Sequence, residues 1–201
     1  MKKIKEILIG THNKGKIKEI SYLINKKIKK ISPIELKIKS PAETGKNFKS
    51  NSELKAKYFF QKSKKITISD DSGLCVECLG NEPGIYSARW AKKYGGFIKA
   101  MSKIIKLVKN KNKNKNKKNT KAKFVCSLTL YINSKKKITT LGVINGNISN
   151  KRMGKNGFGY DPIFIPTGQK LTFGQMEKKK KMLMDHRYIA FKKLKSKINI
   201  L

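Results

Sequence analysis

Two adjacent carboxylates, Asp70 and Asp71, are the residues in this chain best suited to chemistry, and they lie in the stretch Ser69–Leu74. The preceding apolar run Ile66–Ile68 predicts a β-strand, and Gly73 permits a sharp bend at its end. Open α/β sheets bind ligands at the carboxyl ends of their strands, where this pair would lie. Neighbouring side chains of a strand face opposite sides, so the two carboxylates should have different roles. The alternative is an ordinary turn, because Asp, Ser and Gly are favoured in turns.

The loop Thr11–Lys16 is a second candidate site, because it joins a predicted strand, Ile4–Gly10, to a predicted helix. In that helix, apolar residues share one face at helical spacing: Ile17, Ile20, Leu23 and Ile24. The first N–H groups of a helix lack partners within it, so the loop could cradle an anion. The spacing also matches part of a Walker A loop, but Ile17 replaces the Ser or Thr that would bind magnesium. We therefore keep the anion cradle and reject the P-loop.

Glu43 is the third candidate, because an acidic residue is informative in a chain with 12 acidic and 49 basic residues. It stands in a predicted loop, after a second predicted strand over 28–34, and an ordinary solvated carboxylate is an equally common explanation for it. Asn47 is a suitable cap for a helix that runs to about Lys62. Asn51 and Lys55 are four residues apart and share one face of that helix.

The elements that must position these residues alternate between strands and helices along the chain. A helical stripe runs from Phe97 to Val108, and Phe124–Ile132 and Lys137–Ile148 predict a β-hairpin that turns at Asn133-Ser134. Gly157-Phe158-Gly159-Tyr160-Asp161-Pro162 would present a phenylalanine ring outward, before a short strand. The last helix, roughly Glu177–Ile198, carries Lys181, His186 and Arg187. This order predicts an α/β fold of the mixed α+β type.

Composition predicts a single domain over residues 1–201 with a core of its own. No apolar run approaches the ~18 residues of a membrane span, and the amino end predicts a first strand rather than a signal peptide. Three scattered cysteines predict buried free thiols in a reducing cytoplasm, although Cys75 and Cys78 form a C-x-x-C.

The net charge of +37 suggests a nucleic-acid partner, but only three of the 49 basic residues are arginine. Proteins that read bases favour the arginine fork, so we prefer a composition drifted toward lysine over a specific nucleic-acid function. Non-specific, salt-sensitive association with polyanions still follows from the charge. The Lys/Asn run 109–121 has no periodicity and predicts a disordered or mobile surface loop.

Five segments occur in the order and spacing of one enzyme family: Thr11-x-Asn13-x-x-Lys16; Glu43-Thr44-Gly45 with Asn51 and Lys55; Asp70–Leu74 through Ser87-Ala88-Arg89; Gly157–Pro162; and His186-Arg187. Together they resemble the inosine triphosphate pyrophosphatase family, from Ile4 to about Leu194. The resemblance implies an elongated two-lobed subunit with a central mixed sheet and a cleft between the lobes, paired as a homodimer. It also implies a cytoplasmic enzyme that cleanses the nucleotide pool by hydrolysing ITP, dITP and XTP to the monophosphate and pyrophosphate, with Mg²⁺.

The same resemblance implies roles for single residues. Glu43 and Asp71 would bind magnesium, and Asp71 would also accept the proton of the attacking water. Lys55 would add positive charge to the triphosphate, and Ser72 would contact the substrate. The triphosphate cradle would consist of Thr11, His12, Asn13, Lys14, Gly15 and Lys16. Around the base, on which Phe158 would stack, would lie Gly159, Tyr160, Asp161, Lys181, His186 and Arg187.

The chain departs from the family pattern at several positions, among them Ser50, where the family usually has Glu, and Asp185, where it usually has Ser. Two alternatives stand beside the main prediction. One is a broader-range nucleoside triphosphate pyrophosphatase, and the other is a basic nucleic-acid-binding module. The second lacks aromatic residues interleaved with its basic run, which single-strand binders use for stacking.

Overall fold

The computed structural model describes residues 4–113, 115, 116 and 118–198, and the chain divides into two compact units. Unit 1 contains residues 1–71, 126–142 and 186–201, and unit 2 contains residues 72–125 and 143–185. Strands and helices alternate along the chain, so the predicted mixed α/β fold is confirmed.

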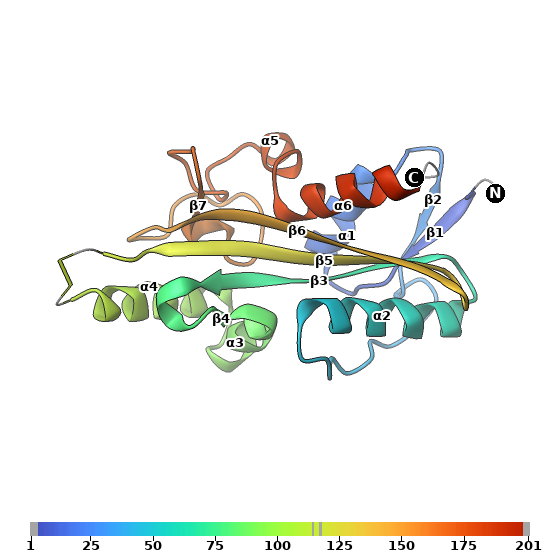
Figure 1. Ribbon diagram of the computed structural model, residues 1–201, viewed down its shortest axis with the longest axis horizontal. Coiled ribbons are helices and arrows are strands. Elements are labelled where there is room, and N and C mark those ends of the chain that lie inside the picture. Colours follow the sequence, from blue (N-terminus) through green and yellow to red (C-terminus); the bar gives the residue numbers. More distant parts are fainter. Residues whose placement is uncertain (1–3, 114, 117, 199–201) are drawn as a thin grey trace. The chain divides into compact units, whose positions relative to one another are not determined.

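The strands belong to one mixed sheet in the order β2-β1-β3-β5-β6-β7, with β4 paired to β3 (Figure 1). β1 pairs in parallel with β2 and β3, whereas β4 and β7 pair antiparallel with their neighbours. The strands are β1 (Glu6–Ile9), β2 (Lys29–Ile31), β3 (Thr67–Val76), β4 (Glu82–Pro83), β5 (Lys121–Asn133), β6 (Lys136–Ile148) and β7 (Phe164–Pro166). The α-helices are α1 (Lys14–Leu23), α2 (Phe48–Ser63), α3 (Ser87–Lys93), α4 (Phe97–Lys111), α5 (Lys178–Met182) and α6 (His186–Lys197).

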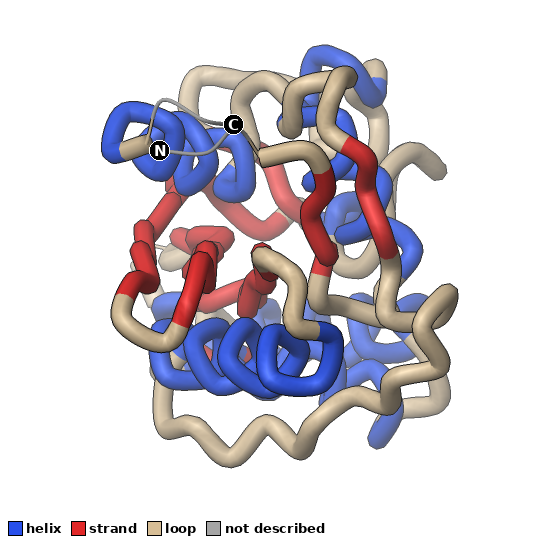
Figure 2. The backbone as a smooth tube through the Cα atoms, turned by 90° about the vertical axis from the view of Figure 1, so that its right-hand side faces the viewer, coloured by secondary structure: helices blue, strands red, loops and turns tan. Residues whose placement is uncertain are grey.

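Unit 1 has helices on both faces of its strands (Figures 1 and 2). Side chains of β1 alternate between the two faces, as those of a strand must. Ile7 and Ile9 belong to the core that α1 and α6 cover, with Ile20 and Phe191 among its members. Leu8 lies in the smaller core on the other face, which α2 covers.

Unit 2 has a separate core, to which β3, α3, α4 and the segment 160–176 all contribute. The predicted stripe of α4 is confirmed, since Met101, Ile104 and Val108 are buried in this core. Aromatic rings pack at its centre, where the rings of Phe124 and Phe164 meet edge to face with centroids 4.7 Å apart. These contacts anchor the irregular segment 160–176 without a long regular element.

Two helices of unit 1 begin with an asparagine cap, of which the one at Asn47 was predicted. Asn13 begins α1, and its side chain accepts hydrogen bonds from the backbone of Gly15 and Lys16. Asn47 begins α2 in a capping box, in which Ser50 occupies the reciprocal position. Ser50 therefore has a structural role at the position where the resemblance led us to expect Glu.

The predicted bend at Gly73 is wrong, because β3 continues without a turn from Thr67 to Val76. The two carboxylates lie in the middle of this strand rather than at its carboxyl end. Apolar residues continue beyond the glycine and bury that part of the strand in unit 2. Gly73 serves close packing instead, since a Cβ there would lie 2.1 Å from the backbone oxygen of Gly84.

The predicted last helix is two helices, α5 and α6, separated by residues 183–185. They belong to different units, since unit 2 ends at Asp185 and unit 1 resumes at His186. α5 buries a lysine, Lys181, whereas α6 buries an apolar face that includes Ala190 and Leu194.

The predicted loop over 109–121 is wrong at both ends, although residues 114 and 117 lie outside the described residues. α4 extends to Lys111 and β5 begins at Lys121. Asn112 is buried, and its amide donates to the carbonyl oxygens of Val108 (2.8 Å) and Asn119 (3.0 Å). Its carbonyl oxygen accepts from the backbone N–H of Asn119 at 2.7 Å. Side-chain hydrogen bonding, which hydrophobic periodicity does not register, closes this connection.

Other boundaries moved by a few residues. The second strand is shorter than predicted, at Lys29–Ile31, and the hairpin turns at Ser134 and Lys135, one residue later than predicted. The three cysteines are free, as predicted, and burial raises the pKa of Cys75 to about 11. Among the described residues, no helix is long and apolar enough to cross a membrane.

Replacing Asn112 by Ala should destabilise the protein by about 1–3 kcal/mol, because buried backbone groups would lose their partners. Asn110→Ala is the matched control, since Asn110 is exposed on the same helix. Urea unfolding of the two variants measures the difference. Equal stabilities would mean that Asn112 does not hold the connection closed.

Candidate active site

The carboxylates of Glu43 and Asp71 meet at the ammonium group of Lys55 in unit 1. Lys55 Nζ lies 2.5 Å from Glu43 Oε1 and 3.5 Å from Asp71 Oδ1. Asn51, on the same face of α2, donates to Asp71 Oδ2 at 3.1 Å. Its own carbonyl oxygen accepts from the backbone N–H of Gly45 at 2.7 Å, which ties the Glu43 loop to β3.

Charge and burial oppose each other in this cluster. Burial by itself lowers the pKa of Lys55, but the neighbouring carboxylates outweigh it, and the pKa is raised above its usual value. Burial raises the pKa of Asp71 above its usual value, and the positive charges of Lys55 and Lys16 compensate only in part. Lys55 is therefore a firmly charged cation, and Asp71 is a stronger base than an exposed aspartate.

Asp70 has a different set of partners from Asp71, as the alternation along a strand predicted. It is fully buried, and its Oδ2 lies 3.2 Å from both Lys16 Nζ and Arg187 Nε. Arg187 also donates through Nη1 to Glu19 Oε2 at 2.8 Å. Two residues of α1, Lys16 and Glu19, are thereby connected to β3 and α6 through ion pairs.

The predicted anion cradle has an internal acceptor at its centre. Asn13 Oδ1 accepts from the backbone N–H groups of Gly15 (2.9 Å) and Lys16 (3.1 Å). The N–H of Asn13 donates in turn to Thr11 Oγ1 at 3.2 Å. The donors of the cradle therefore point at one place, which the Asn13 amide oxygen occupies. His12 and Lys14 are exposed, and His12 Nδ1 is 2.6 Å from Ser40 Oγ.

A second cluster, around Phe158, lies in unit 2. Asp161 Oδ2 accepts from the backbone N–H of Phe158 at 2.8 Å and lies 2.7 Å from Lys181 Nζ. The Lys181 ammonium is 5.0 Å from the centroid of the Phe158 ring, which is half-buried. Gly157 must be glycine here, because its φ is +73° and a Cβ would lie 2.0 Å from Asp161 Oδ2. Asp185 Oδ2 lies 3.9 Å from Lys181 Nζ.

The remaining predicted residues divide by burial. Ser72 and Gly159 are half-buried positions of unit 2. Tyr160 is a core residue, whose hydroxyl donates to the backbone oxygen of Ser87 at 2.9 Å and whose pKa is raised by burial. In unit 1, His186 and Arg187 are buried in the first turn of α6.

Glu19 is a site residue that sequence reasoning missed. The signal was available, because the rarity of acidic residues singled out Glu43 and applies equally to Glu19. Its burial beside Arg187 could not be predicted, since that arginine is 168 residues away in the sequence.

Glu43 and Asp71 are the residues of unit 1 that could hold a divalent cation. Among the described residues, no group of three or more His, Cys, Asp or Glu side chains is arranged to hold a metal by itself. Two hard carboxylates that already share a cation, Lys55, suit magnesium, which keeps waters and takes few protein ligands.

Removing Asp161 should destabilise the protein by about 3–5 kcal/mol, because Lys181 would keep a buried charge without its nearest carboxylate. The double variant Asp161→Ala/Lys181→Met is the control, since it removes both charges and should recover part of the loss. Urea unfolding measures both. No difference between the single and double variants would contradict the buried ion pair.

Comparison with known proteins identifies a family model and close relatives that match nearly the whole chain. The sequence model of the Ham1 family matches residues 7–197. A dITP/XTP pyrophosphatase of Zymomonas mobilis is 37% identical over 189 residues, which cover 94% of this chain and 89% of the relative. One from Dictyoglomus thermophilum is 38% identical, over 94% of this chain and 92% of the relative.

Solved structures agree with the sequence relatives. A HAM1 protein from Coxiella burnetii superimposes with a TM-score of 0.86 at 28% identity, over 98% of this chain and 99% of that chain. The Staphylococcus aureus Ham1 protein gives a TM-score of 0.79 at 34% identity, over 97% and 98%. With the match of the family model over residues 7–197, these likenesses show that the chain belongs to the Ham1 family.

Proposed function

We propose that this protein hydrolyses the non-standard purine nucleoside triphosphates ITP, dITP and XTP to the monophosphate and pyrophosphate. Relatives that match almost the whole chain carry the name dITP/XTP pyrophosphatase, which supports this substrate class. The observation that carries the proposal is the Glu43–Lys55–Asp71 cluster, because it combines two carboxylates with a buried cation beside a lysine-bearing loop.

The substrate's phosphates would bind in unit 1, where Lys16 and Lys55 supply positive charge. The donor role of the loop Thr11–Lys16 remains a prediction, because Asn13 Oδ1 accepts from the N–H groups of Gly15 and Lys16. Hydrolysis adds water across the bond between the α- and β-phosphates and releases pyrophosphate. Asp71 would accept the proton of that water, since a carboxylate beside a bound cation stays ionised. Asn51 would fix the orientation of the Asp71 carboxylate through its 3.1 Å hydrogen bond.

Magnesium would be held by Glu43 and Asp71. When bound, it would neutralise charge on the phosphates and assist in orienting the water. Lys55, which pairs with both carboxylates, would supply positive charge beside the phosphates.

The purine would bind at the Phe158 cluster of unit 2. The half-buried Phe158 ring offers a stacking face, and the Asp161–Lys181 pair provides both an acceptor and a donor for base edges. Arg187 already donates to Asp70 and Glu19 in unit 1, so its role toward the base, like that of His186, remains a prediction. The homodimer and the cytoplasmic location also remain predictions.

Asp71→Asn and Glu43→Gln should each lower kcat/KM for ITP by about a hundredfold or more, because a carboxylate beside the phosphates contributes several kcal/mol. Glu53→Gln is the matched control, since Glu53 pairs with Lys137 and Thr139 elsewhere in unit 1. Pyrophosphate release at saturating magnesium measures all three. Control-like activity in the Asp71 and Glu43 variants would contradict their assignment.

The broader-range alternative is tested by comparing ITP, XTP and ATP. A site that donates to the O6 of a purine should reject the amino group of adenine, so kcat/KM for ATP should be at least about a hundredfold lower. The buried Asp185 carboxylate could accept from that amino group, but it faces Lys181, so Asp185→Ser should change the ratio little. Near-equal use of ATP by the wild type would favour the alternative.

A further inference from the structure

One end of unit 2 carries two cavities lined by lysine. The larger, of about 910 Å³, lies where the end of α4, the connection to β5 and the end of β6 meet, and Lys106, Lys109, Lys113 and Lys118 line it. The smaller, of about 460 Å³, lies over β3, β5 and β6, and Lys121 and Lys123 line it. We call these six lysines the lysine end of unit 2. Among the lining residues of both cavities, Glu77 is the single acidic one.

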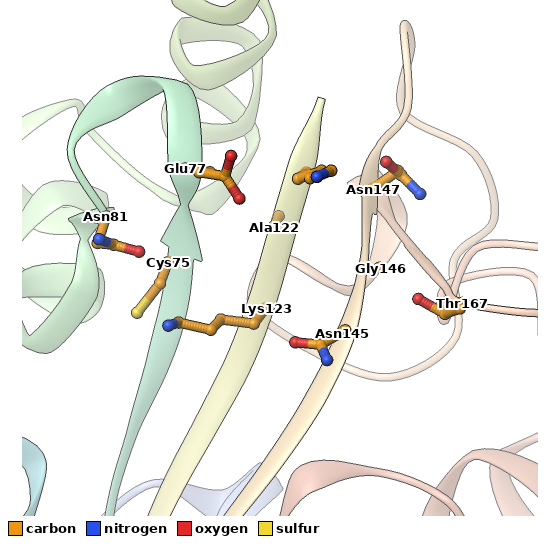
Figure 3. Close-up of a pocket in the computed structure, with 10 residues that line it drawn as sticks. Cys75, Glu77, Asn81, Ala122, Lys123, Asn145, Gly146, Asn147 and Thr167 are labelled. Atoms are coloured by element: carbon orange, nitrogen blue, oxygen red, sulfur yellow. The ribbon is translucent and has the colours of Figure 1, made fainter. Parts of the chain in front are cut away.

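The two cavities lie on opposite sides of the strand ends. Lys121 and Lys123 of β5, with Asn145 and Asn147 of β6, line the smaller cavity, while Thr120 and Ile148 line the larger one. Neighbouring residues of a strand face opposite sides, so a ligand that reached both cavities would have to bend around the ends of the strands. Figure 3 shows Cys75, Lys123 and Asn145 side by side on the smaller cavity's face.

Hydrogen bonds fix the ridge between the two cavities, which consists of the adjoining ends of β5 and β6. Thr120 Oγ1 donates to Asn147 Oδ1 at 3.1 Å, and Asn119 Nδ2 donates to Glu77 Oε1 at 3.0 Å. Asn112 binds Asn119 from the other side. The Glu77 carboxylate therefore accepts a hydrogen bond from the Asn119 amide. The strand ends between the two cavities carry their lysines on a backbone that these hydrogen bonds hold in place.

Positive charge on both sides of a ridge suits a flexible polyanion. Lys106 and Lys109 are three residues apart on α4 and share one face of it, and Lys113 follows in the turn after the helix. The cavity walls add asparagine amides and the half-buried Ile105, which suit base edges and sugar as well as phosphate. A rigid duplex would not bend around the strand ends, whereas a single strand would.

We propose that the lysine end of unit 2 binds the phosphodiester backbone of single-stranded nucleic acid, without sequence preference. The described lining residues of the two cavities include no aromatic side chain, so the contact is with phosphates and involves no stacking of bases. The surface is separate in sequence from both clusters of the proposed nucleotide site, so it adds a binding activity to the proposed function. Binding involves no reaction, and its strength should fall steeply with salt as condensed counterions are released.

The test is fluorescence anisotropy with a labelled oligodeoxythymidine 20-mer, titrated at several salt concentrations. The test variant combines Lys106→Gln, Lys109→Gln, Lys113→Gln and Lys118→Gln. The matched control combines Lys57→Gln, Lys62→Gln, Lys192→Gln and Lys195→Gln, which removes the same charge from exposed helix positions of unit 1. Hydrolysis of ITP by each variant reports whether the nucleotide site is intact.

The test variant should lower affinity at least tenfold at about 0.1 M salt, and its slope of log K against log salt should be shallower by about 3, since each single-strand phosphate contact contributes about 0.7. The control should change the slope by less than about 1, and both should hydrolyse ITP like the wild type. Equal losses in the two variants would show that net charge alone governs binding and would overturn the proposal.

Two competitors separate the ligand classes. Unlabelled duplex DNA and poly-glutamate of equal charge should compete less well than the single strand, because neither a rigid duplex nor a carboxylate chain matches the bent, amide-bearing surface. Equal competition by poly-glutamate would identify an acidic-protein surface, and equal competition by duplex DNA would identify a duplex surface. Either outcome would overturn the assignment to single strands, and neither depends on whether ITP is the substrate.

Discussion

The burial of two neighbouring carboxylates in β3 is the constraint on which the arrangement of unit 1 depends. A buried aspartate needs counter-charges with good geometry, since removing one partner leaves an uncompensated charge. Asp70 pairs with a lysine of α1 and an arginine of α6. Asp71 pairs with Lys55 of α2 and accepts a hydrogen bond from Asn51 of the same helix. One strand thereby fixes the positions of helices on both faces of the sheet. The same pairs bring the candidate catalytic base and the phosphate-facing lysines to one strand.

Unit 2 also contains a buried charge that needs a counter-charge, in this case a lysine. Lys181 is buried on a short helix, and Asp161 both compensates its charge and fixes the backbone of Phe158. Because a Cβ at Gly157 would clash with that carboxylate, the glycine before Phe158 is a packing requirement of the ion pair as well as a conformational one. The half-buried Phe158 ring and the buried charge pair are therefore one structural unit. A substitution at any of the three positions should disturb the other two.

Sequence patterns predicted what depends on local spacing. The α1 stripe, the Asn47 cap, the shared face of Asn51 and Lys55, and the opposite orientations of Asp70 and Asp71 all follow from periodicity or capping chemistry. The errors came from contacts that hydrophobic periodicity does not register. Gly73 resembled a bend because nothing in its neighbourhood reveals the approach of Gly84. The break before α6 and the Asn112–Asn119 closure also depend on partners that no local pattern encodes.

The division of the chain into interleaved units has a consequence for biosynthesis. The counter-ion of Asp70 on α6 lies 117 residues further along the chain, and the partner of Glu19 lies 168 residues further. The apolar face of α6 also completes the core that β1 and α1 begin. A nascent chain that ends before α6 therefore lacks Arg187, which pairs with both Asp70 and Glu19, and its core is open. Contacts of such long range slow folding, because the entropy cost of closing a long loop comes before the favourable free energy of the contact. Unit 1, whose first strand precedes every element of unit 2, cannot be completed until α6 has been synthesised.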